Sequence, residues 1–365
     1  LLTRAQIYVG KISALMNPLT YAIINGAIVV LVWTGAVRVD NGYITQGEVV
    51  ALINYMSQIL VELVKLANLI ININKSIACG NRIQSIFEMQ PSITDGSGQK
   101  VDKVQTDTAD RSEEAEYAVE FSHVGLTYAG AGDESLTDID FKVKKGETIG
   151  IIGGTGSGKS SVVNLIPRFY DVTSGFIKVD GKDIKDYPLE ELRGKIGTVL
   201  QKAVLFHGTI RENLKWGNPD ATEEDLNRAI TVAQAKEFVD NKEGRLDFEI
   251  EQGGKNLSGG QRQRLTIARA VVKKPEILIL DDSASALDFA TDAALRKAIR
   301  EMEGETTVFI VSQRAASIQH ADRIVVLDDG KIVGLGTSEE LLESCEVYQE
   351  IYNSQFKKQE GGKTA

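Results

Sequence analysis

The stretch GGTGSGKS at residues 153–160 constrains the fold of this chain more than any other part of its sequence. It matches the pattern G-x-x-x-x-G-K-[ST], in which glycines let the backbone turn its N–H groups inward around a phosphate. Residues 147–152 (ETIGII) predict a buried strand before this loop, and residues 159–166 (KSSVVNLI) predict a helix whose N-terminus faces the anion. The alternative is a glycine-rich turn that binds nothing, but this order of strand, loop and helix indicates a nucleotide site.

Three side chains carry the chemistry expected of such a site. Lys159 supplies a positive charge for the terminal phosphates, and the hydroxyl of Ser160 can bind Mg²⁺. Residues 277–281 (ILILD) predict an apolar strand that brings Asp281 to the edge of the site. The carboxylate of Asp281 can hold Mg²⁺, or a water bound to it, opposite Ser160. We therefore expect a nucleotide site that uses Mg²⁺.

The sequence LSGGQ at residues 257–261 predicts the start of another helix. Ser258 and the free N–H groups of Gly259 and Gly260 offer a second place where an anion can bind. Alone this motif is weak, because Ser-Gly-Gly begins many helices. Together with the phosphate loop and Asp281 it indicates one chain with two phosphate-binding ends.

Residues 19–37 form a run without a charged side chain, close to the ~20 residues that a helix needs to cross ~30 Å of hydrocarbon. A signal peptide is the alternative, but the run is too long for its apolar region and no small-residue cleavage site follows. A capping box at residues 45–48 predicts a second helix towards Met89, with a span at residues 48–72 and a cytosolic extension. Positive residues favour cytosolic flanks and an external turn at residues 38–47, although Arg38 does not fit this rule.

One stripe of the second helix is polar. Glu62 is expected in the inner leaflet, where a carboxylate must face protein, water or a cation such as Lys65. Two interpretations stay open, a wall of a polar translocation path and hydrogen bonding between helices. The stripe consists of Asn54, Gln58, Glu62, Lys65, Asn68 and Asn72.

Composition divides the rest of the chain. The net charge is −10 without a Lys/Arg-rich run, so we expect no nucleic-acid partner. Cys79 and Cys345 have no zinc spacing, and a start at Leu1 rather than Met leads us to expect a fragment that lacks upstream sequence. We expect membrane helices at residues 1–90, an acidic linker at 91–116, a soluble domain at 117–350 and a polar tail at 351–365.

Strands and helices alternate in the soluble domain, which predicts a largely parallel sheet covered on both faces. The predicted strands occupy residues 117–128, 138–143, 147–152, 195–201, 277–280 and 306–312. Predicted helices follow the phosphate loop and LSGGQ and cover much of residues 222–241 and 291–302.

These motifs together resemble those of an ABC transporter of the exporter type, in which a membrane domain is fused ahead of a nucleotide-binding domain. The resemblance covers residues 117–350 and extends to the last two membrane helices. It implies an α/β P-loop domain with a mostly parallel sheet, an added antiparallel strand region and a helical subdomain, preceded by an all-α transmembrane segment. It also implies ATP and Mg²⁺ as cofactors and a place in the cell membrane as a multi-pass protein with the nucleotide domain in the cytosol.

The resemblance also implies roles for individual residues. Tyr128 matches the aromatic that stacks on adenine, and Gln201 matches the Q-loop glutamine that contacts Mg²⁺ or the attacking water. Asp281 matches the Walker B aspartate. The Walker A positions are Gly153, Gly154, Thr155, Gly156, Ser157, Gly158, Lys159, Ser160 and Ser161, the signature is Leu257, Ser258, Gly259, Gly260 and Gln261, and the D-loop is Ser285, Ala286, Leu287 and Asp288.

Two positions depart from the family pattern. Asp282 stands where the family has a glutamate general base, and Gln313 stands where it has a switch histidine. Aspartate is one methylene shorter, and glutamine cannot carry the imidazolium charge. Two tolerated polar exchanges are the alternative. Because both changes affect the same catalytic step, we expect a site that holds ATP and cleaves it slowly.

In this family two domains pair head to tail, and each ATP lies between one Walker A loop and the partner's signature. A weakened site with an intact signature therefore predicts a heterodimer with a second exporter subunit. A non-hydrolytic ATP sensor is the alternative, and the membrane spans and acidic charge argue against a soluble ATPase acting on DNA or ribosomes. Family habit suggests a small-molecule, lipid or peptide substrate within a membrane-lipid environment.

Overall fold

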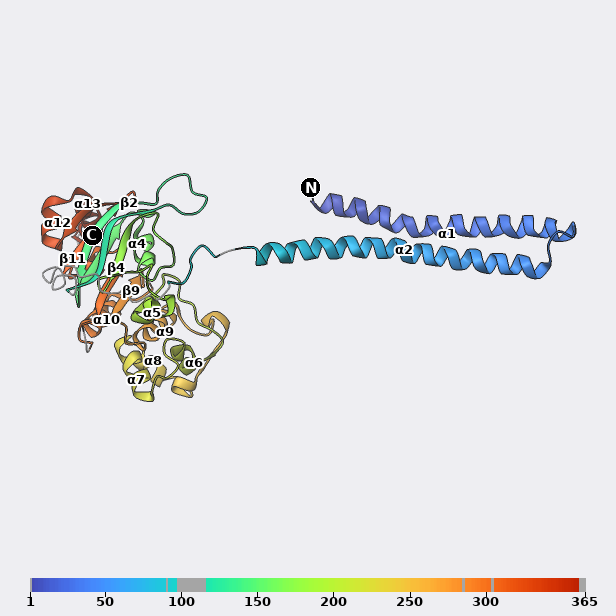
Figure 1. The fold of residues 1–365 in the computed structure, drawn as a ribbon. Coiled ribbons are helices and arrows are strands. Elements are labelled where there is room, and N and C mark those ends of the chain that lie inside the picture. The colour runs from blue at the N-terminus through green and yellow to red at the C-terminus, as the bar shows by residue number, and fades with distance from the viewer. Residues whose placement is uncertain (1, 90, 97–115, 284–285, 303–304, 361–365) are drawn as a thin grey trace. The chain divides into compact units, whose positions relative to one another are not determined.

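The computed structural model describes residues 2–89, 91–96, 116–283, 286–302 and 305–360. These residues form two compact units, Leu1–Ser92 and Ile93–Ala365 (Figure 1). The predicted linker at residues 91–116 lies mostly outside the described residues. Of its described residues, 93–96 belong to the second unit, where a carboxylate oxygen of Asp95 accepts the N–H of Leu189 at 2.7 Å.

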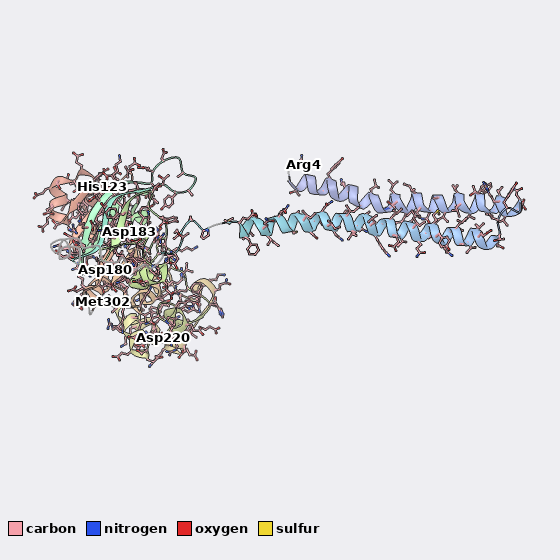
Figure 2. The ribbon with its side chains drawn as sticks, in the orientation of Figure 1. Arg4, His123, Asp180, Asp183, Asp220 and Met302 are labelled. Atoms are coloured by element: carbon pink, nitrogen blue, oxygen red, sulfur yellow. The ribbon has the colours of Figure 1, made fainter. Side chains whose placement is uncertain are left out.

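The first unit is a pair of long antiparallel helices, α1 (Leu2–Asp40) and α2 (Gln46–Phe87). Thr45 and Glu48 form the predicted capping box, in which each side chain accepts the other residue's backbone N–H. Segments Pro18–Asp40 and Gln46–Phe87 are long and apolar enough to cross a membrane, with mean hydropathies of 1.9 and 1.6. Their side chains project into the surroundings (Figure 2), and α2 has no buried residue, unlike a core helix of a soluble domain. Lys65 pairs with Glu62 at 2.8 Å, as the stripe predicts.

The second unit is built on a six-stranded sheet of order β12-β11-β3-β10-β9-β6. Neighbouring strands from β6 to β11 run parallel, and only β12, at one edge, is antiparallel to its neighbour. The carboxyl ends of the parallel strands therefore meet at one edge of the sheet. The strands are β3 (Thr148–Gly153), β6 (Ile196–Val199), β9 (Ile277–Asp281), β10 (Thr307–Val311), β11 (Arg323–Asp328) and β12 (Lys331–Gly336).

A separate antiparallel sheet has the order β2-β1-β4-β5. Its strands are β1 (Tyr117–Leu126), β2 (Leu136–Lys144), β4 (Ser174–Val179) and β5 (Lys182–Asp183). The first two predicted strands of the soluble domain thus belong to this sheet and not to the parallel one. A two-stranded sheet joins β7 (Gly208–Thr209) to β8 (Glu249–Ile250). The mixed architecture confirms the predicted fold class.

The helices fall into groups along the chain. The phosphate loop leads into α4 (Lys159–Leu165), and α5 (Leu189–Lys195) precedes β6. The helical subdomain holds α6 (Ile210–Lys215), α7 (Glu223–Val232), α8 (Lys236–Asp240) and α9 (Gly259–Val271). The C-terminal part adds α10 (Phe289–Arg300), α11 (Ala315–Ile318), α12 (Ser338–Ser344) and α13 (Glu346–Glu360).

Strand β9 shows how the sheet is buried on both faces. Ile277 and Ile279 belong to the core shared with the antiparallel sheet, whereas Leu278 and Leu280 belong to the core of the helical subdomain. Successive side chains of a strand point to opposite faces, so an uninterrupted apolar run suits a strand covered on both sides. The end of this strand is consequently held in place by packing from two layers.

Several predicted boundaries differ from those in the structure. Strands β1 and β6 end two residues before Tyr128 and Gln201, so both side chains lie on loops rather than at strand ends. Residues 351–360, predicted as a polar tail, continue α13, and Ile351, Tyr352 and Phe356 pack against the core. Residues 361–365 lie outside the described residues.

Candidate nucleotide-binding site

The phosphate loop adopts a backbone that only glycine accepts easily at two positions. Gly156 has φ 85° and Gly158 has φ 92°. A Cβ at Gly158 would also approach Leu136 Cδ2 to 2.6 Å, whereas one at Gly154 or Gly156 would meet no atom within 4 Å. The loop is therefore packed against β2 on one side and open on the other, where its backbone N–H groups can face an anion.

Lys159 lies inside this loop. Its Nζ donates hydrogen bonds to the carbonyl of Gly153 at 3.0 Å and to Ser157 Oγ at 3.4 Å. Burial lowers the pKa of Lys159, while the carboxylates of Asp282 and Asp281 act in the opposite direction. The ammonium thus lies beside the open face of the loop, where a phosphate would supply the negative charge that favours its protonated form.

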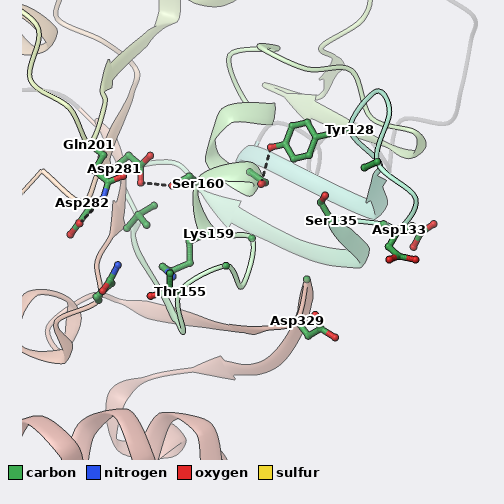
Figure 3. Close-up of a pocket in the computed structure, with 18 of the residues that line it drawn as sticks. Tyr128, Asp133, Ser135, Thr155, Lys159, Ser160, Gln201, Asp281, Asp282 and Asp329 are labelled. Atoms are coloured by element: carbon green, nitrogen blue, oxygen red, sulfur yellow. Dashed lines mark hydrogen bonds between the residues drawn. The ribbon is translucent and has the colours of Figure 1, made fainter. Parts of the chain in front are cut away.

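Ser160 and Asp281 come together although they are far apart in sequence. Ser160 Oγ donates to Asp281 Oδ1 at 3.0 Å (Figure 3). Burial raises the pKa of Asp281, with a smaller contribution in the opposite direction from the Ser160 bond. Two hard oxygen atoms at this spacing fit Mg²⁺, which takes one or two protein ligands plus phosphates and water. Among the described residues there is no group of three or more His, Cys, Asp or Glu side chains that could hold a metal ion.

Asp282 directly follows strand β9 in an unusual conformation. Its φ is 45°, in the left-handed region, and its backbone N–H donates to the carbonyl of Val311 on β10 at 2.9 Å. Its side chain accepts a hydrogen bond from Gln201 Nε2 at 3.2 Å. A non-glycine residue at positive φ costs of order 1–3 kcal/mol and is often found at functional sites. The surrounding strands therefore hold the Asp282 carboxylate in a defined place.

The aromatic side chain of Tyr128 lies at the other end of the site. Its hydroxyl donates to Ser161 Oγ at 2.9 Å, and its ring packs edge to face on Tyr170 with centroids 4.9 Å apart. The ring is half-buried. One part of it thus stays accessible to a flat ligand such as a nucleobase.

A cavity of about 630 Å³ connects these residues. It brings together predicted site residues from five separate segments of the chain (Figure 3). The predicted site residues on its wall are Tyr128, Thr155, Gly156, Gly158, Lys159, Ser160, Ser161, Gln201, Asp281, Asp282 and Gln313. Gly153, Gly154 and Ser157 complete the phosphate loop but do not line the cavity.

Part of this wall has no signal in the sequence. The loop between β1 and β2 contributes Asp133, Glu134 and Ser135, and the turn between β11 and β12 contributes Asp329 and Gly330. An Asp-Gly pair between two apolar runs is a turn signal, but nothing in the sequence places that turn beside the phosphate loop. The two sheets bring it there, since the carbonyl of Gly330 accepts the N–H of Thr137 on β2 at 2.9 Å.

The predicted signature lies elsewhere, at the start of α9. Ser258 precedes the helix, and its Oγ accepts the N–H of Gln261 at 3.2 Å, while Gln261 Oε1 accepts the N–H of Ser258 at 3.0 Å. Ser258 and Gly259 are exposed, Gly260 is half-buried and Leu257 is buried. None of these five residues lines the described cavity.

The predicted D-loop also lies away from the cavity wall. Asp288 precedes α10, and its side chain accepts the N–H of Thr291 at 2.9 Å. Leu287 is buried, and Ala286 is exposed. Ser285 lies outside the described residues.

A phosphate loop between β3 and α4, with Ser160 and Asp281 joined beside it, defines a P-loop nucleotide-binding domain preceded by apolar helices. Residues 136–285 match the family model for ABC transporters. An uncharacterized ABC transporter ATP-binding protein of Mycobacterium tuberculosis is 39% identical over 357 residues, which cover 97% of this chain and 60% of that protein. The chain belongs to the ABC transporter family.

Other comparisons agree. An ATP-dependent lipid A-core flippase of Vibrio vulnificus is 33% identical over 344 residues, which cover 94% of this chain and 57% of the flippase. A bacterial Atm1-family ABC exporter, solved with ATP bound, matches with a TM-score of 0.75 and 28% identity over 94% of this chain and 59% of that one. The chain thus has an ABC exporter fold, is a membrane protein, and spans about 60% of the length of the curated relatives that it matches.

Proposed function

We propose that this chain is the ATP-binding and membrane-spanning part of an ABC exporter, which couples ATP binding and hydrolysis to substrate export. The exporter fold supports this proposal, as do the cavity around the phosphate loop and two apolar helices ahead of it. The nucleotide domain lies in the cytosol, and the turn between α1 and α2 lies on the other side of the membrane. The substrate is a small molecule, a lipid or a peptide.

In this proposal the chain's own residues bind and orient ATP. The loop N–H groups and Lys159 hold the phosphates, and Tyr128 stacks on the base. Ser160 and Asp281 would hold Mg²⁺, which when bound would neutralise charge on the terminal phosphates. Gln201 would contact Mg²⁺ or orient the attacking water. Each of these side chains lines the same cavity.

The proposed site binds ATP but hydrolyses it slowly, and the position of Asp282 supports this inference most directly. A general base must come within about 2.6–3.2 Å of the water that it deprotonates. The Asp282 carboxylate accepts a hydrogen bond from Gln201 at 3.2 Å, and the backbone φ of 45° sets the direction in which its short side chain leaves the main chain. A shortfall of ~1 Å can reduce the rate about 10²-fold. Gln313 at the cavity wall can donate a hydrogen bond to a γ-phosphate but brings no charge.

We also propose that the signature completes the nucleotide site of a different subunit. Ser258 and Gly259 are exposed at the start of α9 and lie outside the cavity of their own chain. A helix start with free N–H groups can bind an anion on a partner. Weak hydrolysis here and an accessible signature suit a heterodimer with a second exporter subunit. The alternative, a non-hydrolytic ATP-sensing half, uses the same cavity without transport.

The test introduces the residues of the family pattern at positions 282 and 313. We expect Asp282→Glu with Gln313→His to raise single-turnover ATP hydrolysis at this chain's site by about 10²-fold, because base and charge are both regained. The double variant and the unmodified protein are each purified at full length from the native membrane, together with any stoichiometric second subunit. Their hydrolysis rates are then compared. No gain in hydrolysis would contradict the slow-site proposal, and recovery of self-paired chains alone would contradict the heterodimer.

A further inference from the structure

The loop after β10 carries Gln313 along the cavity wall and leads into α11. The described structure holds both ends of this loop. At its start the N–H of Ser312 donates to the carbonyl of Ile151 on β3 at 3.1 Å. At its end the guanidinium of Arg296, on α10, donates to the carbonyl of Ser317 at 3.2 Å. Between these two ends the N–H of Arg314 donates to Ser312 Oγ at 2.9 Å, and a third contact reaches the main chain from outside the loop.

Gln355 of the C-terminal helix α13 makes this third contact with both halves of its side-chain amide. Its Nε2 donates to the carbonyl of Gln313 at 2.7 Å, and its Oε1 accepts the N–H of Ala315 at 2.9 Å. One amide thus binds the backbone on both sides of Arg314. A carboxylate in its place would lack the donor, and an apolar side chain would lack both groups.

The helix that presents Gln355 is well anchored. Tyr348 on α13 is fully buried, and its hydroxyl lies 2.8 Å from Ser338 Oγ at the start of α12. Ile351 and Phe356, on either side of Gln355 along the helix, pack against the same core. Because α13 is packed in this way, the amide of Gln355 has a defined position relative to β10.

We propose that Gln355 is a positioning residue, which sets the main chain at Gln313 and links the C-terminal helix to the nucleotide site. Gln355 itself does not line the cavity, so it acts through the loop rather than on the nucleotide. The inference rests on the proposed function, in that it assumes bound ATP to contact Gln313. The physical reason is that ~1 Å of displacement of a catalytic loop can change a rate about 10²-fold.

The experiment compares Gln355→Leu and Gln355→Glu with the control Gln349→Leu in the full-length protein. Gln349 lies on the same helix and donates to the carbonyl of Leu342 at 2.8 Å, away from the cavity loop. Hydrogen exchange of the backbone at residues 312–318 is measured with and without ATP. ATP turnover and ATP affinity are measured for the same three changes in the Asp282→Glu, Gln313→His background.

We expect Gln355→Leu to abolish the ATP-dependent protection of residues 312–318. It should lower turnover about tenfold or more while ATP affinity changes less than about twofold, because the phosphate loop is untouched. Gln355→Glu should match this loss at pH 8 and recover as the pH falls, since a protonated carboxyl group can again donate to the Gln313 carbonyl. The pH profile of the background protein and of Gln349→Leu should lack this recovery.

The proposal is overturned if Gln355→Leu keeps the ATP-dependent protection, or if Gln349→Leu causes the same loss. Absence of any ATP-dependent protection in the unmodified protein overturns it as well. These results are separate from the fate of the slow-site proposal. That proposal fails if Asp282→Glu with Gln313→His gives no gain in hydrolysis, whereas the exchange measurement still decides the role of Gln355 without any hydrolysis.

Discussion

Gln201 donates a side-chain hydrogen bond to Asp282 at 3.2 Å across 81 residues of sequence. The bond joins the loop after β6 to the residue after β9, because these two strands are parallel neighbours and end at the same edge of the sheet. One side chain proposed to orient water thus also holds the proposed base. These two segments of the nucleotide site are thus hydrogen-bonded directly to each other.

The conformation of Asp282 gives the first prediction. Its φ of 45° favours glycine, so Asp282→Gly should raise the unfolding free energy by about 1 kcal/mol. The same change should abolish the remaining hydrolysis at this chain's site. Thermal unfolding and single-turnover hydrolysis measure the two effects, with Asp282→Asn as the control that keeps the strain. Equal stability of the glycine and asparagine variants would show that the backbone is not strained.

Lys159 gives the second prediction, on ATP affinity. Lys159→Met removes a buried ammonium from the phosphate loop, and a hydrogen bond to a charged group contributes about 1.5–3 kcal/mol. The Kd for ATP should therefore rise about 10-fold to 10²-fold in a direct binding assay. Lys142→Met, on the exposed face of β2, is the matched control and should leave the Kd unchanged. A similar Kd for both variants would remove Lys159 from the site.

The raised pKa of Asp281 predicts how stability depends on pH. Burial disfavours its charged form, so the folded protein binds the proton more tightly than the unfolded chain does. The free energy of unfolding therefore falls as the pH rises from the pKa of Asp281 in the unfolded chain through its higher pKa in the folded protein. It stays lower at neutral pH. Asp281→Asn should raise the Tm of the ligand-free protein at pH 7, by about 2–4 °C for each kcal/mol recovered, and weaken Mg²⁺-dependent ATP binding. An unchanged or lower Tm would contradict a raised pKa of Asp281 in the folded protein.

The aromatic ring and the hydroxyl group of Tyr128 can be tested separately. Tyr128→Phe removes only the hydroxyl, whose hydrogen bond goes to Ser161 within the protein, and should change ATP affinity much less than loss of the ring does. Tyr128→Ala removes the ring and should weaken ATP binding about tenfold or more, since stacking on a base contributes about 1–3 kcal/mol. Binding of a fluorescent ATP analogue, competed by ATP, separates the variants. Equal losses would mean that the hydroxyl, not the ring, matters.

The signature gives the last prediction. Ser258→Ala removes the side chain that begins α9 and should cost about 1 kcal/mol of stability. Because Ser258 lies outside the cavity of its own chain, ATP binding there should be unchanged, while turnover by the whole assembly should fall. The matched control is Thr222→Ala, which removes the same kind of helix start at α7. A loss of ATP binding at this chain's cavity would place the signature in its own site.

Some of this arrangement was accessible from local sequence because it depends on short stretches of chain. The capping box of Thr45 and Glu48 and the helix start at Ser258 involve residues three apart, whose geometry a single helical turn determines. The uninterrupted apolar run of β9 likewise predicts a strand buried on both faces. The placement of β1 in an antiparallel sheet, the extension of α13 to Glu360 and the cavity wall at Asp329 lacked such signals.

The sequence by itself determined the phosphate loop, the apolar helices and the chemical identity of the groups beside them, since these follow from side-chain type and near-neighbour spacing. Tertiary structure alone decided which distant groups meet, such as Gln201 with Asp282 and Gln355 with the loop of Gln313. The physical reason is that such contacts depend on strand order and on which helix packs against which edge. Both are set by burial summed over the whole domain rather than by any local pattern.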